Sequence, residues 1–362
     1  MKTVRQFFLV LISFIFIIIS CNKDDSTNND QNDIVVVKQY VWAVGMQDST
    51  GYGLILFSND GGDNWVRQGE GSDVLKNVML YDVWAVDENT VWAVGNNNTI
   101  LKTTDGGNNW VKVTPPTGFS SVYLTSISLA GSDNIWISGS SGVVYNSTDG
   151  GSKWTVFDTG FFHHGLMQGI HAVNSDVVYV AGSYSSGKDE EKGFIAVTAN
   201  GGQSWDSIVP ENNYNRNLWI GVTSADAENI IVYGGKSHYL HTNDGGLTWH
   251  NDSLLNTGGT NGADINCLKM LSPQTWWGAF DYDGIYLTQD NGISWIKQTS
   301  PPPLGMWLIG IDYYNDDIAV ITGVETSSLF GKIIQTTDGG NHWELKQTWG
   351  TWINKVSFIK NR

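Results

Sequence analysis

The chain of 362 residues is short of basic side chains, with 20 Lys and Arg against 36 Asp and Glu and a formal net charge of -16. Nucleic acid and anionic membrane surfaces require a basic footprint, so neither is an expected partner. Two cysteines are too few for a disulfide framework. Only seven prolines accompany 42 glycines and 17 tryptophans. This composition favours many short strands joined by tight turns, and therefore an all-β fold.

The one long apolar run lies at the N-terminus. Lys2 and Arg5 precede the 13-residue stretch Phe7–Ile19, which is apolar except for Ser13. The pattern is typical of a secretory signal, and the stretch is shorter than the roughly 20 residues of a spanning helix. The run ends at Ile18-Ile19-Ser20-Cys21, which resembles the lipobox of bacterial lipoproteins. That resemblance implies removal of residues 1–20 and acylation of Cys21, with palmitate among the attached chains.

Residues 21–33 are almost entirely polar and are expected to form a flexible tether behind the acylated cysteine. Lys23-Asp24-Asp25 resembles the surface-export signals of some outer-membrane lipoproteins. The resemblance implies an outer-membrane lipoprotein that faces the cell exterior and touches the membrane only through its lipid. Cys267 then lacks a partner and is expected to be a buried thiol.

One octet recurs seven times along the rest of the chain. The copies are SNDGGDNW ending at Trp65, TTDGGNNW at Trp110, STDGGSKW at Trp154, TANGGQSW at Trp205, TNDGGLTW at Trp249, TQDNGISW at Trp295 and TTDGGNHW at Trp343. The gaps between these tryptophans are 45, 44, 51, 44, 46 and 48 residues. A regular period of this length predicts a repeat architecture.

The octet resembles the Asp-box, Ser/Thr-x-Asp-x-Gly-x-x-Trp, of sialidase-like β-propellers. Its third residue is expected to accept hydrogen bonds from the amides of its own turn, while the glycines adopt positive φ. Asn200 and Asn291 depart from the pattern, which predicts two looser turns. Each octet forms a separate hairpin, so no metal site is expected. The structural residues at this position are Asp60, Asp105, Asp149, Asn200, Asp244, Asp290 and Asp338.

A second element precedes each octet, beginning with VWAVG at residues 41–45 and again at 91–95. Such continuous apolar runs suit strands buried on both faces. Each unit therefore contains four strands, a to d, with the octet at the c-to-d turn. Residues 34–360 are predicted to form a seven-bladed β-propeller. Residues 352–359 are expected to supply strand a of the first blade and close the ring.

In such a blade the a-to-b and c-to-d turns share one face, here called the Asp-box face. The b-to-c loops and d-to-a connections share the other, here called the loop face, where we expect function to reside. Aromatic residues there can stack on sugar rings. The candidate ligand-binding residues are Tyr123, His163, His164, Tyr184, Tyr214, Arg216, Trp219, Tyr282, Trp307 and Trp352.

Enzymatic alternatives find little support in the sequence, and no catalytic residue or cofactor is assigned. A sialidase needs three arginines near the substrate carboxylate. The sequence has only four arginines, Arg5, Arg67, Arg216 and Arg362, and these are not expected to form that triad. A hydrolase would need two nearby carboxylates, for which Asp281 and Asp283 are the candidates. A polyuronate lyase could use His163 or His164, with His171, His238 and His241 as further imidazoles.

The VWAVG-plus-octet cadence also resembles photosystem II assembly-factor propellers, although their basic docking surface has no counterpart in this acidic chain. The sequence therefore predicts a binding protein that captures a neutral glycan, with a polysaccharide or oligosaccharide as its partner. A scaffold for other outer-membrane proteins and a glycan-active hydrolase or lyase remain the alternatives.

Overall fold

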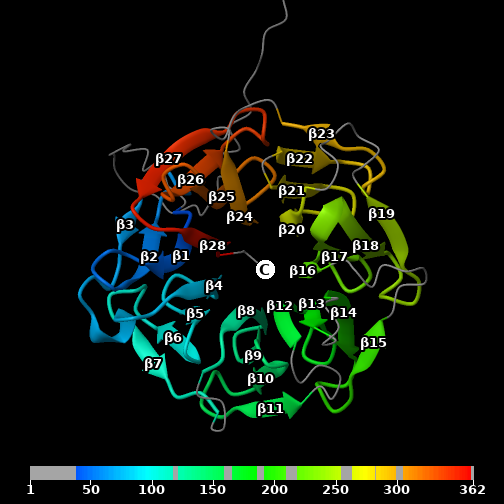
Figure 1. Cartoon of the computed structure of the whole chain (residues 1–362), viewed down its shortest axis with the longest axis horizontal. Coiled ribbons are helices and arrows are strands. Elements are labelled where there is room, and N and C mark those ends of the chain that lie inside the picture. Colours follow the sequence, from blue (N-terminus) through cyan, green and yellow to red (C-terminus); the bar gives the residue numbers. More distant parts are fainter. Residues whose placement is uncertain are drawn as a thin grey trace, which may run out of the picture. The chain divides into compact units, whose positions relative to one another are not determined.

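The computed structural model describes residues 38–116, 121–158, 165–185, 191–208, 218–253, 263–281, 283–298 and 305–359. Within these ranges the strands form seven antiparallel sheets of four strands each. The sheets stand around a central axis as the blades of a propeller (Figure 1). The predicted fold class, a seven-bladed all-β propeller, is confirmed.

Each blade runs from an innermost strand a to an outermost strand d. Blade 1 is β28 (Ile353–Phe358), β1 (Val41–Gln47), β2 (Gly53–Ser58) and β3 (Val66–Arg67). Blade 2 is β4 (Leu80–Ala85), β5 (Val91–Gly95), β6 (Thr99–Thr103) and β7 (Val111–Val113). Blade 3 is β8 (Leu124–Ala130), β9 (Asn134–Gly139), β10 (Val143–Ser147) and β11 (Thr155–Asp158). Blade 4 is β12 (Gly165–Ala172), β13 (Val178–Ser185), β14 (Glu191–Thr198) and β15 (Asp206–Ile208).

The remaining blades follow the same order. Blade 5 is β16 (Trp219–Ser224), β17 (Ile230–Gly234), β18 (His238–Thr242) and β19 (His250–Ser253). Blade 6 is β20 (Ile265–Met270), β21 (Trp276–Phe280), β22 (Gly284–Thr288) and β23 (Ile296–Lys297). Blade 7 is β24 (Met306–Tyr313), β25 (Ala319–Glu325), β26 (Gly331–Thr336) and β27 (Glu344–Trp349). Two short 3-10 turns, η1 (Asp73–Leu75) and η2 (Gly235–Ser237), lie in connections.

The ring closes through the last strand of the chain. Strand β28 pairs antiparallel with β1, with Val41 opposite Phe358 and Val44 opposite Lys355. This pairing supplies the inner strand that the first blade lacks, as the sequence predicts. Because the final strand completes the first blade, backbone hydrogen bonds join the two ends of the repeat region.

The strands b and c carry most of the core. The five residues of β5 and the five of β21 are all buried, in agreement with the apolar runs of the sequence. Trp42, Trp92 and Trp136 are at most 1% exposed and lie between blades. Among the described residues no helix is long and apolar enough to cross a bilayer.

All seven octet turns repeat one set of hydrogen bonds. In blade 2 the Thr103 hydroxyl donates to Asp105 Oδ1 at 2.8 Å and accepts the Gly107 N–H at 2.9 Å. The same carboxylate accepts the Asn109 N–H at 2.8 Å. In blade 4 Asn200 makes the equivalent contacts through its amide oxygen. The expectation of a looser turn is therefore wrong for Asn200, because the acceptor oxygen that the turn requires is still present.

The octets and the a-to-b turns lie on the same face. In each blade the N–H at the first glycine position donates to a carbonyl just before strand b, at 2.9–3.1 Å. Asn291, which replaces that glycine in blade 6, keeps this bond to the Gln274 carbonyl at 3.0 Å and adopts φ 60°. The Asn291 turn is therefore not loosened in this bond either. The loops at the opposite ends of the strands form the loop face.

Candidate functional site

A β-bulge occurs at the same place in all seven inner strands. The register of strand a against strand b shifts by one residue near the loop-face end of each strand. The extra residue bends the strand locally and redirects its neighbours. The seven bulged residues are Tyr81, Thr125, Gln168, Ile220, Asn266, Ile309 and Asn354.

The bulge explains the glycine that ends VWAVG and its variants. A Cβ built on Gly95 would lie 2.1 Å from the carbonyl oxygen of Met79, and one on Gly234 would lie 2.0 Å from that of Leu218. The residue after the glycine donates its N–H to the same oxygen, as Asn96 does to Met79 at 3.0 Å. Six blades have glycine at this position, where an added Cβ would collide with the carbonyl. Blade 6 has Phe280 instead, and the Asp281 N–H still donates to the Asp264 carbonyl at 3.1 Å. The glycine therefore has a structural role at the loop face.

The residue whose carbonyl faces this position, glycine in six blades and Phe280 in blade 6, presents its side chain at the loop-face end of each inner strand. These seven side chains, here called the mouth ring, are mostly large and apolar and are exposed or half-buried. The next residue along each strand is at most 1% exposed, because successive side chains in a strand alternate in direction. The mouth ring consists of Met79, Tyr123, Leu166, Leu218, Asp264, Trp307 and Trp352.

Aromatic rings of neighbouring blades contact one another at the mouth ring. Trp307 of blade 7 and Trp352 beside blade 1 meet edge to face, with centroids 5.6 Å apart. Tyr123 is 49% exposed and meets the bulged Tyr81 of blade 2 edge to face at 6.2 Å. Tyr123, Trp307 and Trp352 were predicted from the sequence as ligand-binding residues. They lie at one structural position in three blades.

Trp219 occupies a different position from the other predicted tryptophans. It is 1% exposed and packs with Tyr179 and Val232 between blades, which leaves its ring no free face for a ligand. Leu218, one residue earlier, holds the mouth-ring position in blade 5. The difference of one residue reverses the side of the strand, so Trp219 joins the core instead.

The other predicted ligand residues are less well placed by the structure. Tyr184 is the next-to-last residue of β13, on the loop face, and is half-buried against Phe194, with ring centroids 6.4 Å apart. The remaining candidates lie outside the described residues: His163, His164, Tyr214, Arg216 and Tyr282. Cys21 also lies outside them.

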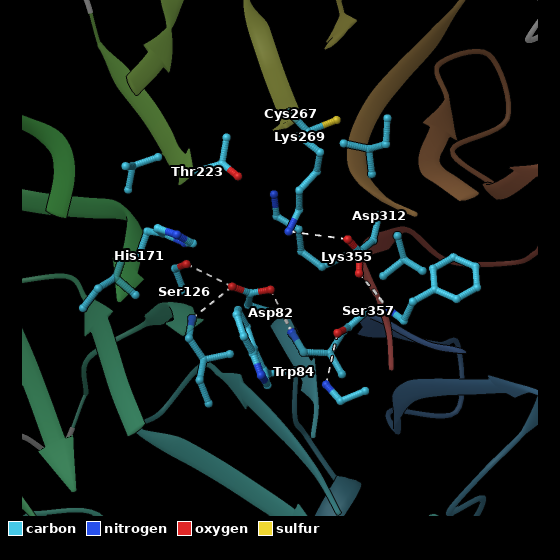
Figure 2. Close-up of a pocket in the computed structure, with 18 of the residues that line it drawn as sticks. Asp82, Trp84, Ser126, His171, Thr223, Cys267, Lys269, Asp312, Lys355 and Ser357 are labelled. Atoms are coloured by element: carbon cyan, nitrogen blue, oxygen red, sulfur yellow. Dashed lines mark hydrogen bonds and ion pairs between the residues drawn. The ribbon is translucent and has the colours of Figure 1, made fainter. Parts of the chain in front are cut away.

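A cavity of about 380 Å³ occupies the central channel and is lined by all seven inner strands. Its polar lining includes Asp82, His171, Lys269, Asp312 and Lys355, which converge on the channel axis in Figure 2. The cavity also reaches Gly131 and Ser132 in the a-to-b turn of blade 3, whereas none of the described lining residues belongs to the mouth ring. It therefore extends toward the Asp-box face. Sequence reasoning missed this site because its residues are scattered singly over seven repeats.

Several channel side chains link one blade to the next. Asp82 of blade 2 accepts the Ile127 N–H of blade 3 at 3.0 Å, and Asp312 of blade 7 accepts the Phe358 N–H of blade 1 at 2.8 Å. Ser357 accepts the Ala85 N–H in the same way at 3.0 Å. The inner edge of each sheet exposes amides that its own blade cannot satisfy, and these side chains pair with them.

Burial in the channel shifts the pKa values of side chains that line it. Burial raises the pKa of Asp82, although Lys355 and three hydrogen-bond donors oppose the effect. Burial raises the pKa of the Cys267 thiol to about 12, so this thiol is protonated and poorly reactive at neutral pH. The expectation of a buried Cys267 is confirmed, with 2% of its surface exposed.

The groups considered for catalysis are engaged in other contacts. Asp283 accepts hydrogen bonds from Lys297 at 2.7 Å and from the Tyr286 hydroxyl at 2.7 Å, while Asp281 contacts Asn266. His171 lines the channel from blade 4, whereas His241 lies on β18 of blade 5 beside Asp252. Among the described residues no group of three or more His, Cys, Asp or Glu side chains could hold a metal ion.

Comparisons with known proteins place this geometry in context. Residues 70–225, less than half of the chain, match the family model described as photosynthesis system II assembly factor YCF48. The similarity is to YCF48-type propellers. A comparison with curated protein sequences gives no match.

Solved structures agree on the fold. YCF48 from Cyanidioschyzon merolae superposes with a TM-score of 0.59 at 15% identity, covering 85% of this chain and 98% of that one. A YCF48 bound to D1 peptide gives 0.58 at 20% identity, covering 74% and 81%. The GH74 enzyme of Niastella koreensis gives 0.53 at 17% identity, covering 88% of this chain and 59% of that one. At these identities the likeness shows the fold alone.

Proposed function

We propose that the protein is a surface-anchored, non-catalytic binding protein that captures a neutral glycan at the mouth ring. The mouth ring carries this proposal, because it repeats one loop-face position around the channel and places Tyr123, Trp307 and Trp352 there. Aromatic faces stack on the apolar faces of sugar rings; Tyr123 is 49% exposed, and the paired Trp307 and Trp352 are half-buried. A neutral ligand suits a chain that carries 16 more acidic than basic residues.

The described chain enters the propeller at a distance from the mouth ring. Gln39, the second described residue, bridges to Asp60 in the octet turn of blade 1, so the chain enters the propeller on the Asp-box face. The 17 residues of 21–37 precede this point. Gln39 therefore lies on the face opposite the mouth ring.

A peptide is the second candidate ligand. The structurally similar YCF48 is known with a D1 peptide bound, and apolar side chains such as Leu166 and Leu218 also suit a peptide. In that case the protein would be an assembly scaffold for other outer-membrane proteins. The mouth ring would serve either role, so the ligand class has to be measured.

Affinity electrophoresis in gels that contain single neutral polysaccharides tests the proposal. We expect at least one polysaccharide to retard the full chain, and the double variant Trp307→Ala with Trp352→Ala to migrate as in a plain gel. Two controls should keep the retardation: Phe330→Ala, an exposed aromatic of the loop face outside the mouth ring, and Leu247→Ala on the Asp-box face. Equal retardation of the double variant would refute the proposal. Absence of retardation together with co-purification of membrane proteins would favour the scaffold.

A further inference from the structure

The central cavity is a candidate binding site separate from the mouth ring. It is lined by inner strands and by the a-to-b turn of blade 3, and it is open to solvent on the Asp-box side at Ser132. At about 380 Å³ it is large enough for one sugar-sized molecule rather than for a polymer. A ligand that binds there would be chemically independent of a glycan held at the loop face.

The charges of the cavity balance one another. Two lysines, Lys269 and Lys355, face two aspartates, Asp82 and Asp312. Lys269 Nζ lies 3.6 Å from Asp312 Oδ1, and Figure 2 shows both lysine side chains reaching into the channel. A charged ligand would leave a net buried charge in this neutral set, which is unfavourable in a partly desolvated site. The ligand should therefore be uncharged.

The hydrogen-bonding capacity of the cavity is uneven. Asp82 already accepts the Val83 and Ile127 N–H groups and the Ser126 hydroxyl, at 2.9, 3.0 and 3.0 Å. The Lys355 ammonium has three protons and donates to the Ile309 carbonyl at 3.3 Å, its one hydrogen bond within the described chain. The cavity therefore offers charged donors to a ligand rich in acceptor oxygens, whereas both aspartates that line it already accept hydrogen bonds from the protein.

The wall also contains the aromatic side chains of Trp84, Tyr233 and Phe358, together with further hydroxyl groups. Trp84 is half-buried and lies beside Asp82 in the lining (Figure 2). Thr223 of blade 5 lines the cavity from the far side of the channel. An indole face together with fixed donors and hydroxyls is suited to a molecule that has an apolar ring face and many hydroxyl groups.

We propose that the central cavity binds a small neutral polyol, a single sugar residue or a molecule of that size and chemistry, which enters from the Asp-box face. Lys355 donates to its oxygens and Trp84 stacks on its ring. This site is distinct from the glycan site at the mouth ring and does not depend on it.

Saturation-transfer-difference NMR on the full chain tests the site, with glucose, galactose, xylose and myo-inositol as neutral probes and with glucuronate, an anion, and ethanolamine, a cation at neutral pH, as charged ones. We expect a signal from at least one neutral probe. Trp84→Leu should remove it, and Lys355→Met should weaken binding roughly tenfold, as expected for the loss of a charge-assisted hydrogen bond. No neutral signal, or a stronger signal from either charged probe, would overturn the proposal.

Chemical blocking of the entrance provides a second measurement if those variants fold poorly. Ser132→Cys places an exposed thiol at the cavity rim, and Ser152→Cys places a matched thiol in the neighbouring octet turn. The buried Cys267 does not compete for a maleimide. A bulky maleimide attached at position 132 should abolish the signal, whereas the same label at position 152 should not. Loss of the signal only in Trp307→Ala with Trp352→Ala would overturn this cavity site and place the sugar at the mouth ring.

Discussion

Gly95→Ala is the substitution whose effect follows most directly from the geometry of the blades. The added Cβ would lie 2.1 Å from the Met79 carbonyl oxygen and 3.0 Å from its carbon. Atoms in ordinary contact lie about 3.5 Å apart, so strands β4 and β5 would have to separate by more than about 1 Å. That movement would also break the hydrogen bond from Asn96 to Met79, which is 3.0 Å long.

The expected loss of stability combines two effects. Overpacking of a filled site is worth about 1–3 kcal/mol, and the broken hydrogen bond adds about 1 kcal/mol. Unfolding entropy scales as about 2.1 cal/mol/K per residue, which for the 325-residue unit from Lys38 to Arg362 is roughly 0.7 kcal/mol/K. The melting temperature should therefore fall by about 3–6 °C.

Differential scanning calorimetry measures this shift, with Gly350→Ala as the matched control. A Cβ on Gly350 would meet no heavy atom within 4 Å, so its melting temperature should change by less than about 1 °C. Gly234→Ala repeats the test in blade 5, where the Cβ would lie 2.0 Å from the Leu218 carbonyl oxygen. If Gly95→Ala and Gly350→Ala melt alike, the steric account of the bulge is wrong.

Two further predictions concern titration. Hydrogen bonds from Thr248 and Thr242 hold the pKa of Asp244 at about 2 in the folded state, below the value of 3.8 for a free side chain. A carboxyl group whose pKa is lower in the folded state stabilises the fold above its unfolded pKa, so the free energy of unfolding should fall as the pH drops from 4 to 2. Asp244→Asn should reduce this pH dependence in urea titrations. An unchanged pH dependence in the variant would contradict the prediction. In a Cys21→Ser chain, Cys267 should resist a thiol reagent at pH 8 and react only in urea. Rapid labelling of that native chain would show that the channel is open to the reagent.

Much of the fold could be predicted from the sequence, because the repeat indicates both the number of blades and the order of strands within each blade. Seven octets at near-constant spacing predict the number of blades. The first repeat lacks an inner strand and the end of the repeat region has one extra strand, which implies that β28 closes blade 1. The apolar runs mark the b strands because these are buried on both faces. Each of these signals is local and repeated.

The candidate site was harder to predict because it depends on single-residue register. Trp219 and Trp307 look equivalent in the sequence, yet the bulge places Trp307 in the mouth ring and Trp219 in the core. Aligning Ile220-Gly221 with Ile309-Gly310 could have shown that Leu218 is the counterpart of Trp307. The channel residues give no such signal, because Asp82, Lys269 and Lys355 each occur in one repeat and meet only when the ring closes.

Hydrogen–deuterium exchange of the full chain, with and without the polysaccharide that retards it most in gels, tests the ligand face most directly. The mouth ring predicts slower exchange in the segments around Tyr123, Trp307 and Trp352, with no change at the octet turns. Protection confined to the octet turns, or to the a-to-b turns beside them, would place the ligand on the opposite face and contradict the proposed function.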